Sequence, residues 1–312
     1  IAMAMSILGT QMKSKIIDLM PGALVKFFAN PYVSGASIED GLKTSNNLWE
    51  KYKLYSSLDL LGEAVYDDDM VRYNIETYKQ LLEKLKDNKH ISISLKPTSL
   101  GIHKSFNFCK DSITSILEDA KKQKIPVTID MEDHTLTDTT LKLYTELLED
   151  FPNLGTVLQS RLFRTHTDIE NLSSYNCRIR ICIGIYKEAS DIAYVNKKTM
   201  KDKLINYTHQ LINDGHYVEV ATQDKIYINK LLDDYDQLGW KNNQIEFQQL
   251  LGVPMKSTQD EIFSKNIKNR LYVPFATKWD YALPYLKRRL NNNPKMAIYV
   301  LNHIFRRGFQ IH

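Results

Sequence analysis

Residues 270–293 read Arg270-Leu-Tyr-Val-Pro-Phe-Ala-Thr-Lys-Trp-Asp-Tyr-Ala-Leu-Pro-Tyr-Leu-Lys-Arg-Arg-Leu-Asn-Asn-Asn293 and predict one complete strand–turn–helix unit. The run Arg270–Val273 predicts a short strand, and Pro284 is typical of the first turn of a helix. Residues three and four apart share a helix face, so one stripe contains Tyr285, Arg288, Arg289 and Asn292. Two adjacent guanidinium groups beside a phenol indicate a carboxylate or phosphate site, because arginine pairs such groups with two hydrogen bonds. The alternative is an ordinary solvated basic face.

The same alternation of strand and helix recurs through the chain. The predicted strands are Tyr55–Leu61, Ile91–Leu95, Val127–Met131, Thr156–Ser160, Arg178–Ile183, Tyr217–Ala221, Gln244–Gln248 and Arg270–Val273. The helical patterns between them are Asp68–Lys86, Lys110–Lys122, Asp138–Glu149, Lys201–Asn213, Lys225–Tyr235 and Thr258–Lys265. Several strands are near-continuous apolar runs, as in buried parallel sheets. We therefore predict an α/β fold, a (β/α)8 TIM barrel. An open doubly wound sheet is the alternative, disfavoured because no glycine-rich phosphate motif follows a strand.

The sequence before the first predicted strand indicates an additional helix. Ser37-Ile-Glu-Asp40 is similar to a capping box and predicts a helix through Lys51, one more than eight strands require. We expect an expression remnant or ragged start and an N-terminal arm over residues 1–36, the barrel over 37–293, and a helical tail over 294–312. The amphipathic stretch Ile16–Phe28 is expected to pack on the barrel, and contact with a membrane surface is the alternative.

Composition excludes several classes of protein. The net charge of the 312 residues is +4, with no long basic run, so we expect no nucleic-acid partner. Three cysteines without a C-x-x-C motif favour a reducing, cytoplasmic compartment over a disulfide framework. No run of eighteen apolar residues is present, so any membrane association would be peripheral, at the inner face.

Polar residues stand where the predicted strands end. In a barrel the carboxyl ends of the strands carry the functional groups, because the following loops build the site there. The residues in these positions are Glu63, Lys96, Asp130, Gln159, Arg180, Thr222, Gln223 and Tyr272. Each has an ordinary alternative as a loop or core residue. Asp130, Glu132 and His134 could also be metal ligands, although no second histidine-rich element completes that set.

The ordered set of motifs is similar to the proline dehydrogenase family, the flavin-dependent barrels that oxidise proline. The resemblance covers residues 27–293. The matching motifs are Leu60-Leu-Gly-Glu63, Ile93-Ser-Leu-Lys96, Ile129-Asp-Met-Glu-Asp133, Leu158-Gln159, Arg180-x-x-x-Gly184-x-Tyr186, Ala221-Thr222, Glu246-Phe-Gln248, Tyr272-x-Pro274 and Tyr285-Leu-Lys-Arg-Arg289. The resemblance implies a distorted barrel with an extra helix before strand one and the last helix over the C-terminal mouth.

The resemblance also implies a role for each matching position. Asp130 and Arg180 would be the active-site carboxylate and the arginine near the reactive nitrogen of the flavin. The substrate would be bound by Lys96, Leu250, Tyr272, Tyr285, Arg288 and Arg289, with Glu63 pairing one arginine. The FAD contacts would be Met131, Gln159, Ile183, Gly184, Ile185, Tyr186, Thr222 and Gln223. No metal is expected.

Four positions depart from the family pattern. The family usually has Lys at position 183, Ala at 185, His at 223 and Glu at 292, where this chain has Ile183, Ile185, Gln223 and Asn292. Ile183 removes a cation from the flavin side, whereas Gln223 retains hydrogen bonding. We expect these departures to affect the FAD affinity and the redox potential more than the reaction.

The implied reaction is the first step of proline catabolism. L-proline would be oxidised to 1-pyrroline-5-carboxylate by hydride transfer to FAD, with a membrane quinone as the electron acceptor. A separate pyrroline-5-carboxylate dehydrogenase would consume the product, because this chain is too short to hold that second enzyme. The alternatives are a metal-dependent TIM-barrel hydrolase and a non-catalytic barrel that binds an anion through Arg288 and Arg289.

Overall fold

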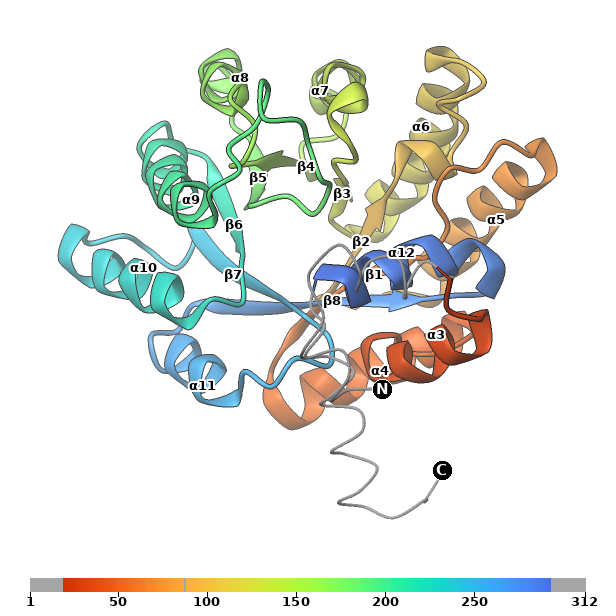
Figure 1. The fold of residues 1–312 in the computed structure, drawn as a ribbon, viewed down its shortest axis with the longest axis horizontal. Coiled ribbons are helices and arrows are strands. Elements are labelled where there is room, and N and C mark those ends of the chain that lie inside the picture. The colour runs from red at the N-terminus through yellow and green to blue at the C-terminus, as the bar shows by residue number, and fades with distance from the viewer. Residues whose placement is uncertain (1–18, 87, 293–312) are drawn as a thin grey trace.

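The computed structural model describes residues 19–86 and 88–292, which form a closed barrel of eight parallel strands in sequential order. Each strand pairs with the next, and β8 pairs back onto β1 (Figure 1). The strands are β1 Tyr55–Leu60, β2 Ile91–Leu95, β3 Val127–Ile129, β4 Leu154–Gln159, β5 Arg178–Cys182, β6 Tyr217–Ala221, β7 Ile245–Leu250 and β8 Lys268–Phe275. The prediction of a (β/α)8 barrel is therefore confirmed.

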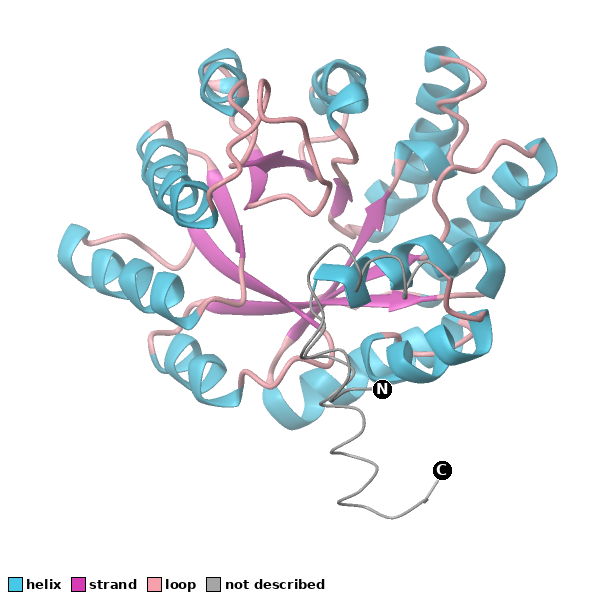
Figure 2. Cartoon of the chain, in the orientation of Figure 1, coloured by secondary structure: helices cyan, strands magenta, loops and turns pink. Residues whose placement is uncertain are grey.

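Helices surround the strands on the outside (Figure 2). They are α5 Asp68–Lys84, α6 Phe106–Gln123, α7 Thr137–Leu148, α8 Thr165–Leu172, α9 Lys197–Asn213, α10 Lys225–Leu238 and α11 Lys256–Ser264. The core between the two layers is apolar, as β2 shows with Ile91, Ile93 and Leu95. Helix α8 was not predicted, because eight residues give too short a pattern to recognise. Strand β3 was predicted to reach Met131, but it ends at Ile129.

The helix before the first strand is present as α4 Ile38–Tyr52. The side chain of Ser37 accepts a hydrogen bond from Asp40 N at 3.1 Å, so the predicted cap is formed. Gly41 brings α4 close to the sheet, since a Cβ there would lie 3.1 Å from Leu58 Cδ2. Because α4 packs against β1 and β8, it occupies the outer position that a helix after β8 would otherwise fill.

The last described helix, α12 Trp279–Asn292, therefore lies elsewhere. Arg288 contacts Glu63 beyond β1 and also lies over the Tyr186 ring beyond β5, so α12 crosses the C-terminal mouth, as expected. Pro284 lies inside this helix, so the prediction that it begins the helix is wrong. Residues before Pro284 are helical because Ala282 is buried in a cluster with Val25 of α3, Gly22–Ala29. That packing outweighs the one lost backbone hydrogen bond.

The helix α3 is part of the arm before the barrel. Its packing against α12 agrees with the expectation that the Ile16–Phe28 stretch lies on the barrel, within the part that is described. The ragged start before residue 19 and the tail after residue 292 lie outside the described residues. Across residues 19–86 and 88–292, no helix has the length and apolar character that a bilayer crossing requires.

Candidate functional site

A cluster of ionisable side chains joins residues within β1, β5 and β8 to the residues that directly follow β2 and β3. Lys96 Nζ pairs with Asp59, donates to Tyr272 Oη at 3.0 Å and lies 3.4 Å from Asp130 Oδ2. Asp130 also accepts from Tyr272 Oη at 2.6 Å and from Arg180 Nη1 at 2.6 Å. The strands end at one edge of the barrel, and the structure therefore brings together four residues that were selected from the sequence.

The opposite charges in this cluster stabilise one another in their ionised forms. Burial alone would raise the pKa of Asp130, which is only 7% exposed, but Arg180 and Lys96 outweigh burial and hold it below its usual value. Burial would lower the pKa of Lys96, but Asp59, Tyr272 and Asp130 together raise it well above 10.5. Asp59 differs, because burial raises its pKa to about 6 despite Lys96. At neutral pH the cluster therefore keeps an ionised Asp130 beside two cations.

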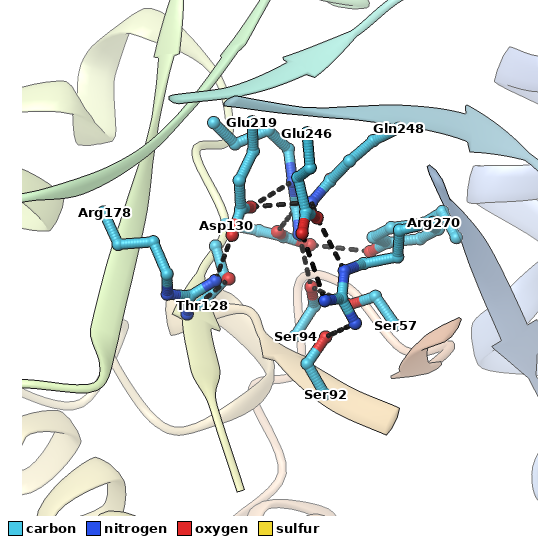
Figure 3. A network of polar contacts seen from close by, with 12 residues as sticks. Ser57, Ser92, Ser94, Thr128, Asp130, Arg178, Glu219, Glu246, Gln248 and Arg270 are labelled. Atoms are coloured by element: carbon cyan, nitrogen blue, oxygen red, sulfur yellow. Dashed lines mark hydrogen bonds and ion pairs between the residues drawn. The ribbon is translucent and has the colours of Figure 1, made fainter. Parts of the chain in front are cut away.

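The network continues down the barrel interior, where the side chains point toward one another (Figure 3). Arg180 Nε lies 3.7 Å from Glu219, which also pairs with Arg178. Gln248 Nε2 donates to Glu219 and to Glu246, both at 2.7 Å. Glu246 in turn pairs with Arg270 at 2.7 Å. Each of these two carboxylates is thus paired with an arginine, and the neutral Gln248 bridges them.

Sequence reasoning missed two acidic members of this network. Asp59 and Glu219 lie inside strands that otherwise look apolar, and both are fully buried. The available signal was their spacing, because Ser57 and Asp59 alternate with apolar residues and so face the same side of β1. An ionisable residue at an inward position of a buried strand requires a partner.

The arginines of α12 lie above this cluster. Arg288 pairs with Glu63 and lies 5.2 Å from the centre of the Tyr186 ring. Burial would lower the pKa of Arg288, but Glu63 outweighs burial and raises it. The buried Nε atoms of Arg288 and Arg289 find no acceptor among the described residues. Each arginine therefore retains a donor for an anion.

Apolar and aromatic groups complete the space below α12. Tyr285 is buried on the same helix, and Leu250 of β7 pairs in register with Tyr272 of β8. The side chain of Asn292, which the sequence analysis placed on the arginine stripe, lies outside the described part of the chain. A small ring with one carboxylate matches these surroundings in polarity.

A second group of predicted residues lies along the ends of β4, β5 and β6. Gln159 is 3% exposed, and its Nε2 donates to Glu132 O at 2.8 Å. Its Oε1 and the Nε2 of Gln223 are buried without a partner among the described residues. Gly184 has φ +99°, and a Cβ there would collide with Gln159 Oε1. Close backbone approach and unsatisfied polar atoms fit a polar, planar ligand.

The other predicted contacts flank this edge. Met131 follows Asp130 and is buried, whereas Ile183, Ile185 and Tyr186 are half-buried beside Gly184. Thr222 is also half-buried, and its Oγ1 accepts from Asp224 N at 3.2 Å. A hydroxyl that accepts one hydrogen bond can still donate another, so Thr222 could donate to a ligand.

The alternative metal site is not supported by the side-chain geometry. Asp130 is engaged by Arg180, whereas Glu132 accepts from Thr98 N at 2.9 Å and from Thr98 Oγ1 at 2.5 Å. His134 Nδ1 lies 2.5 Å from Glu188 instead. Within residues 19–86 and 88–292, no three such side chains converge as a metal site would require. Strand β3 ends before Asp130, and the loop directs the three groups to different partners.

Comparisons with known proteins agree with this arrangement. The family model described as proline dehydrogenase matches residues 41–186 and 179–300. Proline dehydrogenase 2 of Bacillus subtilis (strain 168) is 32% identical over 273 residues, which are 85% of this chain and 86% of that protein. Proline dehydrogenase 1 of the same strain is 30% identical over 282 residues, 89% of this chain and 91% of that protein.

Several solved structures have a fold similar to that of this chain. Proline utilization A from Bdellovibrio bacteriovorus, inactivated by N-propargylglycine, superposes with a TM-score of 0.76 at 20% identity over 85% of this chain. Proline utilization A from Corynebacterium freiburgense gives 0.71 at 18% identity over 96% of this chain. This chain spans about a third of the length of each, 32% and 34%.

Proposed function

The chain belongs to the proline dehydrogenase family, and from this premise we propose that it oxidises L-proline to 1-pyrroline-5-carboxylate with FAD as the cofactor. The observation that carries the proposal is the pair of arginines on α12, each with an unused donor, above the cluster of Lys96, Asp130 and Tyr272. A cationic lid over a mouth lined by tyrosines suits an amino acid with an apolar ring.

The proposed role of α12 is to orient the substrate. The Nε donors of Arg288 and Arg289 would bind the carboxylate, and Lys96 would add a third positive charge from below. Tyr272, Tyr285 and Leu250 would contact the ring. Fixing both ends of a small substrate can account for a large part of the rate enhancement. The substrate amine must lose its proton before the adjacent carbon can give up a hydride.

The row of unsatisfied atoms along β4–β6 supports FAD as the group that completes the site. Gln159, Gly184, Thr222 and Gln223 would hold it, together with Met131, Ile183, Ile185 and Tyr186. Arg180, held by Asp130 at 2.6 Å and with its Nε 3.7 Å from Glu219, would bring a fixed positive charge to the same edge. The chemistry supplied by bound FAD is the acceptance of the hydride. The role of Asp130 is then to orient Arg180 and to compensate its buried charge.

We also propose partners for this reaction. A membrane quinone would be the electron acceptor, reached through a peripheral and reversible membrane contact, and a separate dehydrogenase would consume the product. Half-exposed apolar residues on α3, Leu24 and Phe27, support this contact. Co-sedimentation with anionic liposomes tests it, and a protein that stays in the supernatant with and without proline contradicts it.

The absorption spectrum of the purified protein tests the central proposal. We expect a yellow protein whose flavin bands bleach when L-proline is added without oxygen. Lysine, which also carries a carboxylate but no ring, is the matched control and should leave the bands unchanged. A flavin-loaded protein whose spectrum does not respond to millimolar proline would contradict the proposed reaction.

A further inference from the structure

Arg161 is a half-buried arginine that the proposed function has not used. It follows β4 by two residues, and its backbone is held on both sides. Arg161 N donates to Ile183 O at 3.2 Å, and Tyr194 N donates to Arg161 O at 2.8 Å. The residue is therefore fixed between the end of β5 and the connection that leads to α9.

The side chain of Arg161 lies against the glycine of the cofactor edge. Its Cδ lies 3.1 Å from the point that a Cβ of Gly184 would occupy. The Nη2 donates to Met200 Sδ at 3.7 Å, which is a weak acceptor. The buried Nε has no acceptor, and no carboxylate lies within ion-pair distance of this guanidinium in the described parts of the chain.

The guanidinium is thus desolvated without full compensation. Burial lowers the pKa of Arg161, and Glu188 and Cys182 oppose this only in part. Arg164, three residues later, shows the usual alternative, since it donates to Asp168 at 2.9 Å and to Asp138 at 2.7 Å. Partial burial of a cation without an ion-pair partner is unfavourable, so an anion beside Arg161 would stabilise this side chain.

Arg161 also completes a row of unsatisfied atoms. Gln159 Oε1, Arg161 Nε and Gln223 Nε2 are all buried without a hydrogen-bond partner among the described residues, and they lie at or just after the ends of β4 and β6, on either side of β5. Gln159 and Gln223 are already assigned to the proposed cofactor. Ile183 brings no charge to this edge. Arg161, which is half-buried and lies two residues after Gln159, does carry a positive charge.

We propose that Arg161 contacts bound FAD and balances its negative charge at the β4–β5 edge. The inference rests on the proposed function. Two parts of FAD offer that charge, the pyrophosphate and the reduced ring system, and in both cases the guanidinium would provide a charge-assisted hydrogen bond. Arg161 is then a binding residue that none of the motifs quoted above contains.

The experiment measures FAD affinity rather than turnover. The full chain is stripped of flavin, and FAD is titrated into the wild type, Arg161→Gln, Arg161→Lys and the control Arg72→Gln. Arg72 is a suitable control because its side chain is 63% exposed. We expect Arg161→Gln to raise the Kd for FAD about tenfold or more, the scale of a hydrogen bond to a charged group. Arg161→Lys should retain most of the affinity, and Arg72→Gln all of it.

The midpoint potential of the bound flavin identifies the group that Arg161 contacts. A lower midpoint potential in Arg161→Gln shows contact with the reduced ring. A higher Kd for FAD at unchanged potential shows contact with the pyrophosphate. Equal Kd values and potentials for wild type and Arg161→Gln overturn the inference alone. Failure of the wild type to bind FAD overturns the proposed function as well. The melting temperatures of the flavin-free variants show whether folding contributes to any loss.

Discussion

Arg288 and Arg289 are half-buried on a helix that crosses the barrel mouth. This position determines how much each side chain would contribute to the free energy of substrate binding. A solvated arginine contributes little to binding, because water already satisfies its donors. Here the Nε atoms are shielded from water and have no acceptor among the described residues. A substrate carboxylate would meet donors that are already desolvated.

We therefore expect Arg288→Ala and Arg289→Ala each to lower kcat/KM for proline by a factor of tens to thousands. Loss of one partner from a buried charged pair costs about 2–5 kcal/mol. If the arginines bind ground state and transition state alike, KM changes most, and if they align the reacting carbon, kcat also falls. Steady-state kinetics with Arg72→Ala as the exposed control measure this. Equal behaviour of all three variants would show that the stripe is only a solvated surface.

Glu132 is a buried carboxylate whose protonation affects stability rather than the proposed chemistry. It is 3% exposed, and burial raises its pKa from 4.5 to about 7 despite two hydrogen bonds from Thr98. Below about pH 4.5 the folded and unfolded states are both protonated, so there is no penalty. As the pH rises towards 7 the unfolded state loses its proton first, and the native state loses stability.

Glu132→Gln should therefore stabilise the protein at pH 8 but not at pH 4.5. The largest gain is about 3 kcal/mol, since each pKa unit corresponds to about 1.4 kcal/mol. Urea unfolding at the two pH values measures the gain, with the exposed Glu83→Gln as the control. A gain that is the same at both pH values would contradict the assigned protonation.

At the scale of the elements, Thr98 joins three loops at the barrel mouth. Its Oγ1 donates to Glu132, and Ala64 N donates to the same oxygen at 3.2 Å. Ala64 has φ +53°, a strained value for a residue with a side chain, and it follows Glu63, the partner of Arg288. The loop after β1 is thus held in the conformation that places Glu63 below α12.

Thr98→Val should loosen this loop and raise KM for proline more than it lowers kcat. The buried groups left without a partner should also reduce the free energy of unfolding by about 1–3 kcal/mol. Thr98→Ser retains the hydroxyl and should keep KM near that of the wild type. If Val and Ser have the same KM, then Thr98 does not position Glu63.

Most elements could be predicted because their residues follow simple periods. Strands β2 and β6 have the predicted bounds, since Gly, Pro or polar residues bracket short apolar runs. The start of α12 could not be predicted, because contacts with α3, far away in sequence, decide it. Likewise the strand-end pattern indicated Lys96 and Asp130, whereas the partner Asp59 becomes evident only once β1 lies beside β2.

At the scale of the whole molecule, the charged barrel interior makes stability depend on matched pairs. Arg270 pairs with Glu246 at 2.7 Å and holds the pKa of that carboxylate at about 2, against the effect of burial. This contribution to stability is fully present above about pH 4.5 and is lost as the pH falls towards 2. The barrel interior thus contains a site of acid sensitivity.

Arg270→Met should destabilise the protein by about 3–5 kcal/mol, because it leaves Glu246 buried without its cation. The double variant Arg270→Met with Glu246→Gln should recover a substantial part of this loss. Urea unfolding at pH 7 measures both. A double variant no more stable than the single one would show that packing, and not charge, explains the effect.

The sharing of Glu219 between Arg178, Arg180 and Gln248 also has a consequence for chimeras of this protein. These residues come from three adjacent strands, so a single strand transplanted from a relative carries its charges without their partners. Exchange of β5, β6 and β7 as one block retains these contacts. The natural unit of recombination in this barrel is therefore a group of neighbouring strands, and substitutions within the interior should be inherited together.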